Sequence, residues 1–256
     1  MLDAKAESEY KRGTGCGKTA RPGLCGGFLA TEAPTLRGKL QKVMLKYTDA
    51  PQNKYPIMSQ LNINHFDVKK AGQLVFFFMK KSTLGRMNVT KLRLIKWLYL
   101  AERASYEKFG EPMLGDRLGA LQHGPVTSET LALIEGKSRS FPPNFWGDLI
   151  TVDGGHRHQY VHLASNCKYQ SLDDLDRFSE SEIELLEGIW NKYGHWSATR
   201  LEKYLHNTAY FPEWTWKKGE GTKWIAIEDI LKYVGFEEES IEAQTKQILA
   251  FYAHSE

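Results

Sequence analysis

The chain has 256 residues, 41% of them hydrophobic, which is enough apolar side chain for a buried core. Its net charge of +3 hides an asymmetry, because residues 1–57 carry ten Lys and Arg against five Asp and Glu, whereas the remaining residues carry 24 against 26. A near-neutral main domain argues against nucleic acid as its partner. The three widely spaced cysteines indicate a reducing compartment, and the longest apolar run, residues 74–79, is too short to span a bilayer. We therefore expect a cytoplasmic protein without membrane contact.

Residues 1–57 hold seven of the 22 glycines and show no sustained periodicity, so we expect a flexible, disordered basic tail or an upstream extension of the reading frame. Within this segment RGTGCGKT (12–19) is close to the phosphate-binding pattern G-x-x-x-x-G-K-[ST]. Arg12 occupies the position of the first glycine, and neither a preceding strand nor a following helix is predicted. We interpret this match as coincidental and expect no nucleotide or other cofactor.

The domain is predicted to begin at residue 58, and its first helices are expected over residues 67–82 and 88–110. Apolar residues in the first stand at 68, 71, 74, 75 and 78, the spacing of one helix face. In the second, LRLIKWLYLA (92–101) is apolar around most of its circumference, so this helix is expected at the centre of the core. Gly110 is expected to end it as a C-terminal cap.

The middle of the chain predicts one more helix and one hairpin. A helix is expected to start at Pro125, because the first helical position leaves its N–H unpaired in any case, and to end at Gly136. Residues 148–165 then alternate between apolar and polar on both sides of a turn expected at Asp153-Gly154-Gly155, which is typical of two short strands.

The last third is expected to be helical again. Ser179 and Glu182 form a capping-box pattern before a helix that should stop at Gly194, and Ser197 should begin another. Two further helices are expected over residues 226–234 and 240–253. The sequence thus predicts a mainly α-helical, compact domain over residues 58–256 with one small β-hairpin.

Several residues have side chains suited to catalysis or metal binding, but each also has a simpler structural explanation. His156, His158 and His162 alternate along the hairpin and could bind zinc, but solvated histidines on a strand face explain them more simply. Cys167, near His162, is expected to pack inertly rather than act as a nucleophile. Capping and solvation explain the acidic run Asp173, Asp174 and Asp176 better than acid–base catalysis. We expect no catalytic residue and no metal site.

His123 and the tryptophans are expected to have structural roles. His123 directly precedes Gly124 at the predicted helix start, where it should fix the turn into the helix; a neutral hydrogen-bonding role there is the alternative. Four tryptophans are expected to be anchors in the core or in a cleft: Trp97, Trp190, Trp196 and Trp214.

Four segments recur in an order that is typical of one family. KLRLIKWLYLAE (91–102) precedes ALQHGPVTSETLALIEG (120–136), and Tyr193-Gly194, Ser197, Leu201, His206 and Trp214 then follow. Between residues 66 and 216 this set resembles the Panacea domain of SocA-like antitoxins and phage-associated proteins. Three positions differ from the family pattern: His123 stands where an aromatic residue is usual, the usual Tyr of the following helix is replaced within SETLALI (128–134), and Trp97 stands where Leu is common. These positions are expected to shape a partner-binding groove.

The resemblance implies a non-catalytic subunit that neutralises a protein toxin, encoded by the adjacent gene, through direct binding. The contact surface is expected over residues 123–134 and 190–214. The partner-binding or motif residues that the resemblance implies are Trp97, Tyr99, His123, Gly124, Pro125, Val126, Trp190, Tyr193, Gly194, Ser197, His206 and Trp214. Two alternatives remain open: an adaptor that delivers the toxin to an ATP-dependent protease, and a DNA-binding autoregulator that uses the basic tail.

Overall fold

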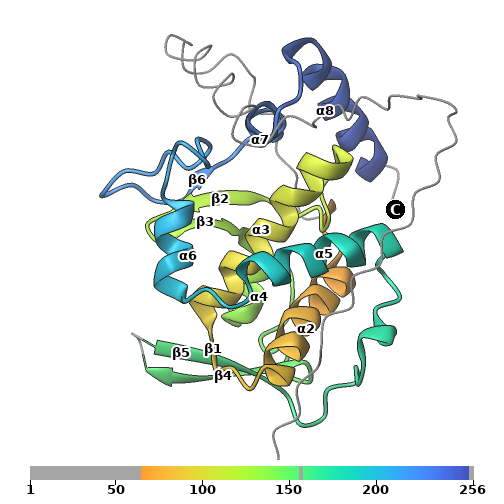
Figure 1. Ribbon diagram of the computed structural model, residues 1–256, viewed down its shortest axis with the longest axis vertical. Helices are drawn as coiled ribbons and strands as arrows, with labels where there is room; N and C mark the ends of the chain where they lie inside the picture. The colour runs from red at the N-terminus through yellow and green to blue at the C-terminus, as the bar shows by residue number, and fades with distance from the viewer. Residues whose placement is uncertain (1–64, 156–157, 254–256) are drawn as a thin grey trace, which may run out of the picture. The chain divides into compact units, whose positions relative to one another are not determined.

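The computed structural model describes residues 65–155 and 158–253, which belong to one folded unit. The RGTGCGKT segment, the boundary predicted at residue 58 and His156 lie outside the described residues. The described part contains seven α-helices and two small antiparallel sheets (Figure 1). The prediction of a mainly α-helical protein is confirmed.

Helices α2 (Val68–Leu84) and α3 (Lys91–Phe109) form as predicted. The carboxylate of Asp67 accepts hydrogen bonds from the backbone N–H groups of Lys69 and Lys70 in α2, and the hydroxyl of Thr90 accepts one from Arg93 in α3. Such caps satisfy donors that have no partner within the helix. At the end of α3, Gly110 has φ +76°, a left-handed conformation that glycine adopts without steric cost.

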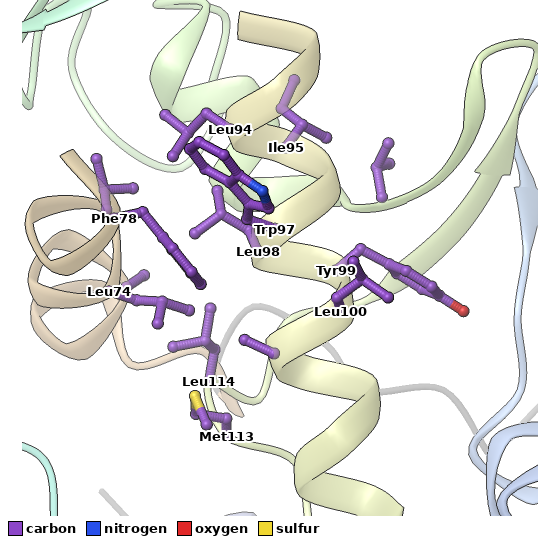
Figure 2. Packing of buried hydrophobic residues seen from close by; sticks show 14 of the residues in the cluster. Leu74, Phe78, Leu94, Ile95, Trp97, Leu98, Tyr99, Leu100, Met113 and Leu114 are labelled. Carbon is purple, nitrogen blue, oxygen red and sulfur yellow. The ribbon is translucent and has the colours of Figure 1, made fainter. Parts of the chain in front are cut away.

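The core lies between α2 and α3, where large aromatic side chains pack together (Figure 2). Phe78 of α2 stacks on Trp97 of α3 with ring centroids 5.6 Å apart. Trp97 points toward α2, whereas Tyr99 points away from it, toward another part of the domain (Figure 2). Both side chains are fully buried. Helix α3 therefore packs on both of its sides, as the broad apolar arc in its sequence predicts.

The predicted C-terminal helices are confirmed. Helix α5 (Glu180–Tyr193) begins with the capping box of Ser179 and Glu182, and α6 (Ala198–Leu205) begins at Ser197, whose hydroxyl accepts from the N–H of Arg200. The last two helices are α7 (Ile227–Val234) and α8 (Glu238–Ala253). Leu186 of α5 and the two buried leucines of α6 belong to the same core as α3.

The predicted hairpin forms one sheet, with strand order β1-β5-β4. Its strands are β1 (Val89–Thr90), β4 (Ile150–Gly155) and β5 (His158–Leu163). The turn predicted at Asp153-Gly154-Gly155 is wrong in position, because Gly154 pairs with Gln159 and Gly155 with His158. A glycine pair is compatible with a strand as well as with a turn, and the pairing across the hairpin extends β4 through both glycines.

A second sheet, with strand order β3-β2-β6, was not predicted. It contains β2 (Leu118–Leu121), β3 (Gly124–Thr127) and β6 (Lys223–Trp224), so the expectation of a single hairpin is wrong. The helix predicted from Pro125 begins only at Ser128 and runs to Ile134 as α4, and Pro125 itself pairs with Ala120. A residue without an N–H suits an edge strand as well as a first helical turn, and β3 lies at an edge of its sheet.

Candidate partner-binding site

A buried lysine of the central helix α3 is hydrogen-bonded to the β2–β3 hairpin. Lys96 of α3 is fully buried, and its Nζ donates a hydrogen bond of 2.9 Å to the carbonyl oxygen of Pro125. Gly119 pairs with Val126 and Leu121 with Gly124 across the hairpin. The segment Gly124-Pro125-Val126, expected to start a helix, is thus a buried edge strand fixed to α3 by a polar side chain.

Position 124 requires glycine because of both its backbone conformation and its surroundings. Its φ of +97° lies in the region that residues with a side chain rarely adopt. A Cβ atom at this position would lie 3.0 Å from Lys96 Nζ and 3.3 Å from the ring of His206. The absence of a side chain at Gly124 lets the hairpin approach both α3 and the end of α6.

His206 and Trp214 pack against the hairpin on another side. The two rings stack with centroids 4.1 Å apart and planes 8° from parallel, and Trp214 Nε1 donates a 2.9 Å hydrogen bond to the carbonyl oxygen of Leu121. The family-motif residues Gly124, His206 and Trp214, which are far apart in sequence, therefore form one cluster. Within the described part of the chain, His206 Nε2 is buried without a hydrogen-bond partner.

His123 lies in the turn between β2 and β3, not at a helix N-terminus as expected. Its Nδ1 is 2.7 Å from a carboxylate oxygen of Glu202 on α6, and its side chain is 67% exposed against 23% for Glu202. The predicted role of fixing a turn into a helix is wrong, because His123 lies between two strands and its contact ties the hairpin turn to α6. His123 is also the most exposed member of this cluster.

Burial changes the pKa values of Lys96 and His206, the two basic residues next to Gly124. Burial lowers the pKa of Lys96 to about 7, and the nearby carboxylate of Glu202 opposes this shift. Burial likewise lowers the pKa of His206; Glu202 opposes the change, whereas the charges of Lys96 and His123 add to it. Lys96 and His206 both approach Gly124, so the hairpin packs against two basic groups that lose protons more readily than they would in water.

A second cluster joins the end of α5 to α3. Trp97 Nε1 donates to the carbonyl oxygen of Tyr193 at 3.1 Å, and an Nη of Arg93 donates to that of Gly194 at 2.8 Å. These bonds satisfy carbonyl groups that a helix end leaves unpaired. A Cβ on Gly194 would lie 2.5 Å from the carbonyl oxygen of Trp190, so this position accepts only glycine without a shift.

Tyr99, on the opposite side of α3, bonds to a carboxylate that sequence reasoning did not select. The Tyr99 hydroxyl donates to Glu213 at 2.7 Å, and Arg103 Nε donates to the same oxygen at 2.6 Å. Glu213 is buried, so the guanidinium compensates a charge that would otherwise be costly. This triad fixes the chain just before Trp214.

Burial divides the twelve predicted site residues into two groups. Only His123 and Ser197 are exposed, while His206 and Trp214 are half-buried. The remaining eight are buried: Trp97, Tyr99, Gly124, Pro125, Val126, Trp190, Tyr193 and Gly194. In this conformation the exposed and half-buried residues are accessible to a partner, whereas the eight buried residues position the backbone beneath them.

Polar residues that complete these clusters were missed, among them Lys96, Glu202 and Glu213. Lys96 had a usable signal, because it stands inside the apolar run LRLIKWLYLA and a helix buried on most of its circumference must bury it. Glu202 and Glu213 carry no local signal, since each is selected only by a residue that lies far away in the chain.

The acidic and histidine candidates occupy other parts of the domain. Asp174 forms a capping box with Ser171, in agreement with the expected capping role. His162 Nε2 lies 3.2 Å from Asp153, and Cys167 is buried with a free thiol. Among the described residues, no group of three or more His, Cys, Asp or Glu side chains is arranged to hold a metal ion. No helix of the described ranges combines the length and the apolar character needed to cross a membrane.

Residues 94–215 match the family model described as antitoxin SocA-like, Panacea domain. This part of the chain is a Panacea domain. The family predicted from the four ordered segments is confirmed, and the match runs from α3 to the residue after Trp214. No curated protein and no solved structure matches the chain significantly. The Panacea domain therefore contains both the cluster around the hairpin and the aromatic end of α5, and the family supports an antitoxin-like role.

Proposed function

We propose that this protein is an antitoxin that neutralises a protein toxin, the product of the adjacent gene, by direct and non-catalytic binding. The observation that carries the proposal is the Panacea-domain match over residues 94–215. The contact surface that we propose is the outer side of α6, and the exposed His123 lies on the other side of this helix, against Glu202. Half-exposed aromatic side chains, which often act as anchors in protein interfaces, are present just before α6 at Trp196 and within it at Tyr204.

The hydrogen bonds beneath this surface support a binding role. The hairpin is held by Lys96, the chain before Trp214 by the Tyr99–Glu213–Arg103 triad, and the end of α5 by Trp97. A surface that is ordered before it binds loses less conformational entropy on association, so more of the contact energy appears as affinity.

Co-expression tests the proposal. The adjacent gene is expressed from an inducible promoter with and without this chain, and growth is followed. We expect arrest with the neighbour alone and growth when both are present, together with co-purification of the two proteins. A neighbour that is harmless alone, or toxicity that persists beside this chain, would refute the proposal.

The half-life of the neighbour separates neutralisation by binding from delivery to a protease. Sequestration should lengthen the half-life of the bound toxin, whereas an adaptor should shorten it in a manner that depends on an ATP-dependent protease. We expect a longer half-life. Rescue that disappears when the protease is deleted would assign the adaptor role instead.

A further inference from the structure

A stripe of cationic and aromatic side chains follows the outer side of the α5–α6 junction. Its members are Lys192, Trp196, Arg200 and Tyr204, each four residues after the last, with Lys203 and Tyr210 beside them. Lys192, Arg200, Lys203 and Tyr210 are exposed, and Trp196 and Tyr204 are half-buried. We call this set the α6 stripe.

The rings of the α6 stripe are held in place by one another. Trp196 and Tyr204 meet edge to face with centroids 5.3 Å apart, and Tyr204 also packs on Tyr210 at 5.5 Å and on the buried Phe211 at 5.0 Å. The guanidinium carbon of Arg200 lies 3.8 Å from the centroid of Trp196. The Trp196 ring therefore supports the guanidinium of Arg200, so this side chain is held in place rather than moving freely in solvent.

The cations of the α6 stripe are not neutralised within the described part of the chain. None of Lys192, Arg200 and Lys203 is within ion-pair distance of a carboxylate there. The acid of the same helix, Glu202, lies on the inner side, where it contacts His123 and acts electrostatically on Lys96. Helix α6 thus separates its charges, with the carboxylate toward the hairpin and the cations outward.

We propose that the α6 stripe docks an acidic segment of the toxin, whose carboxylates pair with Arg200 and Lys203 while an apolar side chain lies on Trp196 and Tyr204. The inference rests on the proposed antitoxin function and adds the chemistry of the partner. Arg can bind a carboxylate through two parallel hydrogen bonds, and aromatic rings supply the apolar contact. Complementary charge also speeds encounter and favours the correct partner.

The charge of the whole domain favours a protein over a nucleic acid as the occupant. Residues after 57 carry 24 Lys and Arg against 26 Asp and Glu, so the domain that bears the stripe has no cationic excess for a phosphate backbone. A local cationic stripe on a slightly acidic domain suits a short segment of clustered carboxylates, because attraction then depends on local charge and not on the net charge.

The test is the affinity of the purified full-length chain for the product of the adjacent gene, measured by calorimetry at several salt concentrations. The variant is R200E/K203E. Position 200 is the third residue of α6 after Ser197, where Glu completes a capping box, so the helix should fold. The control, K69E/K246E, makes the same charge change at exposed lysines of α2 and α8, which lie apart from α6 in Figure 1. Circular dichroism and unfolding curves verify that both variants fold.

We expect R200E/K203E to weaken binding on the order of 10- to 100-fold and to lose most of the salt dependence, while the control stays within about twofold of the wild type. Wild-type binding that R200E/K203E leaves unchanged would overturn the α6 stripe as the docking surface and leave the antitoxin proposal standing. Failure of the wild type to bind the neighbour would overturn both. Salt-sensitive binding to duplex DNA that R200E/K203E abolishes would assign the stripe to nucleic acid and refute the acidic segment.

Discussion

The two sides of helix α6 differ in how their polar groups are used. On the inner side, Glu202 pairs with His123, and His206 at the end of the helix stacks on Trp214 beside Gly124. On the outer side, Arg200 and Lys203 are exposed, and no carboxylate pairs with them in the described ranges. The inner side therefore contributes to the fold, and the outer side has cationic groups available for another molecule.

The family-motif residues that lie near α6 are mainly on its inner side. Gly124, Pro125 and Val126 are buried, and His206 and Trp214 are half-buried against them. We infer that these motif residues maintain a common scaffold and that the outer side of α6 contributes most of the partner contact. Four substitutions test the division, and the control for one of them, Lys96→Met, lies on the outer side of α6.

The largest effect is expected for Gly124→Ala. The substitution forces a side chain into a left-handed conformation at φ +97° and places its Cβ 3.0 Å from Lys96 Nζ. We expect the free energy of unfolding to fall by about 2–4 kcal/mol, measured by urea denaturation. The control is Gly188→Ala in the exposed middle of α5, where a Cβ meets nothing within 4 Å and stability should rise by about 0.5–1 kcal/mol. Equal effects at the two glycines would contradict the tight approach at the hairpin.

Lys96→Met should change how stability depends on pH. The pKa of Lys96 is about 7 in the folded protein and 10.5 ordinarily, so between these values the unfolded chain binds more protons and folding gains stability as pH rises. This gain has a limiting slope of about 1.4 kcal/mol per pH unit, and it should be absent from Lys96→Met. Urea unfolding between pH 6 and about 10 measures the difference.

The matched control for Lys96 is Lys203→Met on the outer side of α6. Lys203 is exposed, so folding removes little water from its ammonium group. Its variant should follow the wild-type pH profile. If Lys96→Met also follows the wild type, Lys96 is not held as a buried amine beneath the hairpin.

Trp214→Phe should lower the free energy of unfolding by about 1 kcal/mol, because the carbonyl oxygen of Leu121 loses the donor that now lies 2.9 Å away. Phe keeps a ring that can stack on His206. Trp216→Phe is the control, since its Nε1 bonds only within the exposed loop at Glu220 and Gly221, and we expect it to change stability by less than about 0.5 kcal/mol. A smaller effect at Trp214 than at Trp216 would show that this bond does not hold the hairpin.

The smallest effect on stability is expected for Arg200→Ala. Its contact with Trp196 lies at the surface, so its loss should cost about 0.5–1 kcal/mol or less. Affinity for the toxin should nevertheless fall on the order of tenfold, as is usual for a central arginine of an interface. Calorimetry and urea unfolding on the same preparation separate the two quantities. Loss of stability without loss of affinity would place Arg200 with the inner residues.

Local signals in the sequence were sufficient for most helices and for their ends. The capping box of Ser179 and Glu182, the αL glycine at Gly110 and the apolar arc of α3 each act within a few residues, so they can be recognised without knowledge of the rest of the chain. The ordered motif segments were likewise sufficient for the family.

Contacts between distant segments decided the remainder. Pro125 fits a helix start and an edge strand equally well, and its pairing with Ala120 and its bond from Lys96 selected the strand. Nothing near Glu202 or Glu213 in the sequence indicates their partners, because His123 and Tyr99 reach them only after the chain has folded. The cationic outer side of α6 arose in the same way: packing of Leu201 and Leu205 on the core sets the rotation of the helix, and this rotation leaves Arg200 and Lys203 facing outward.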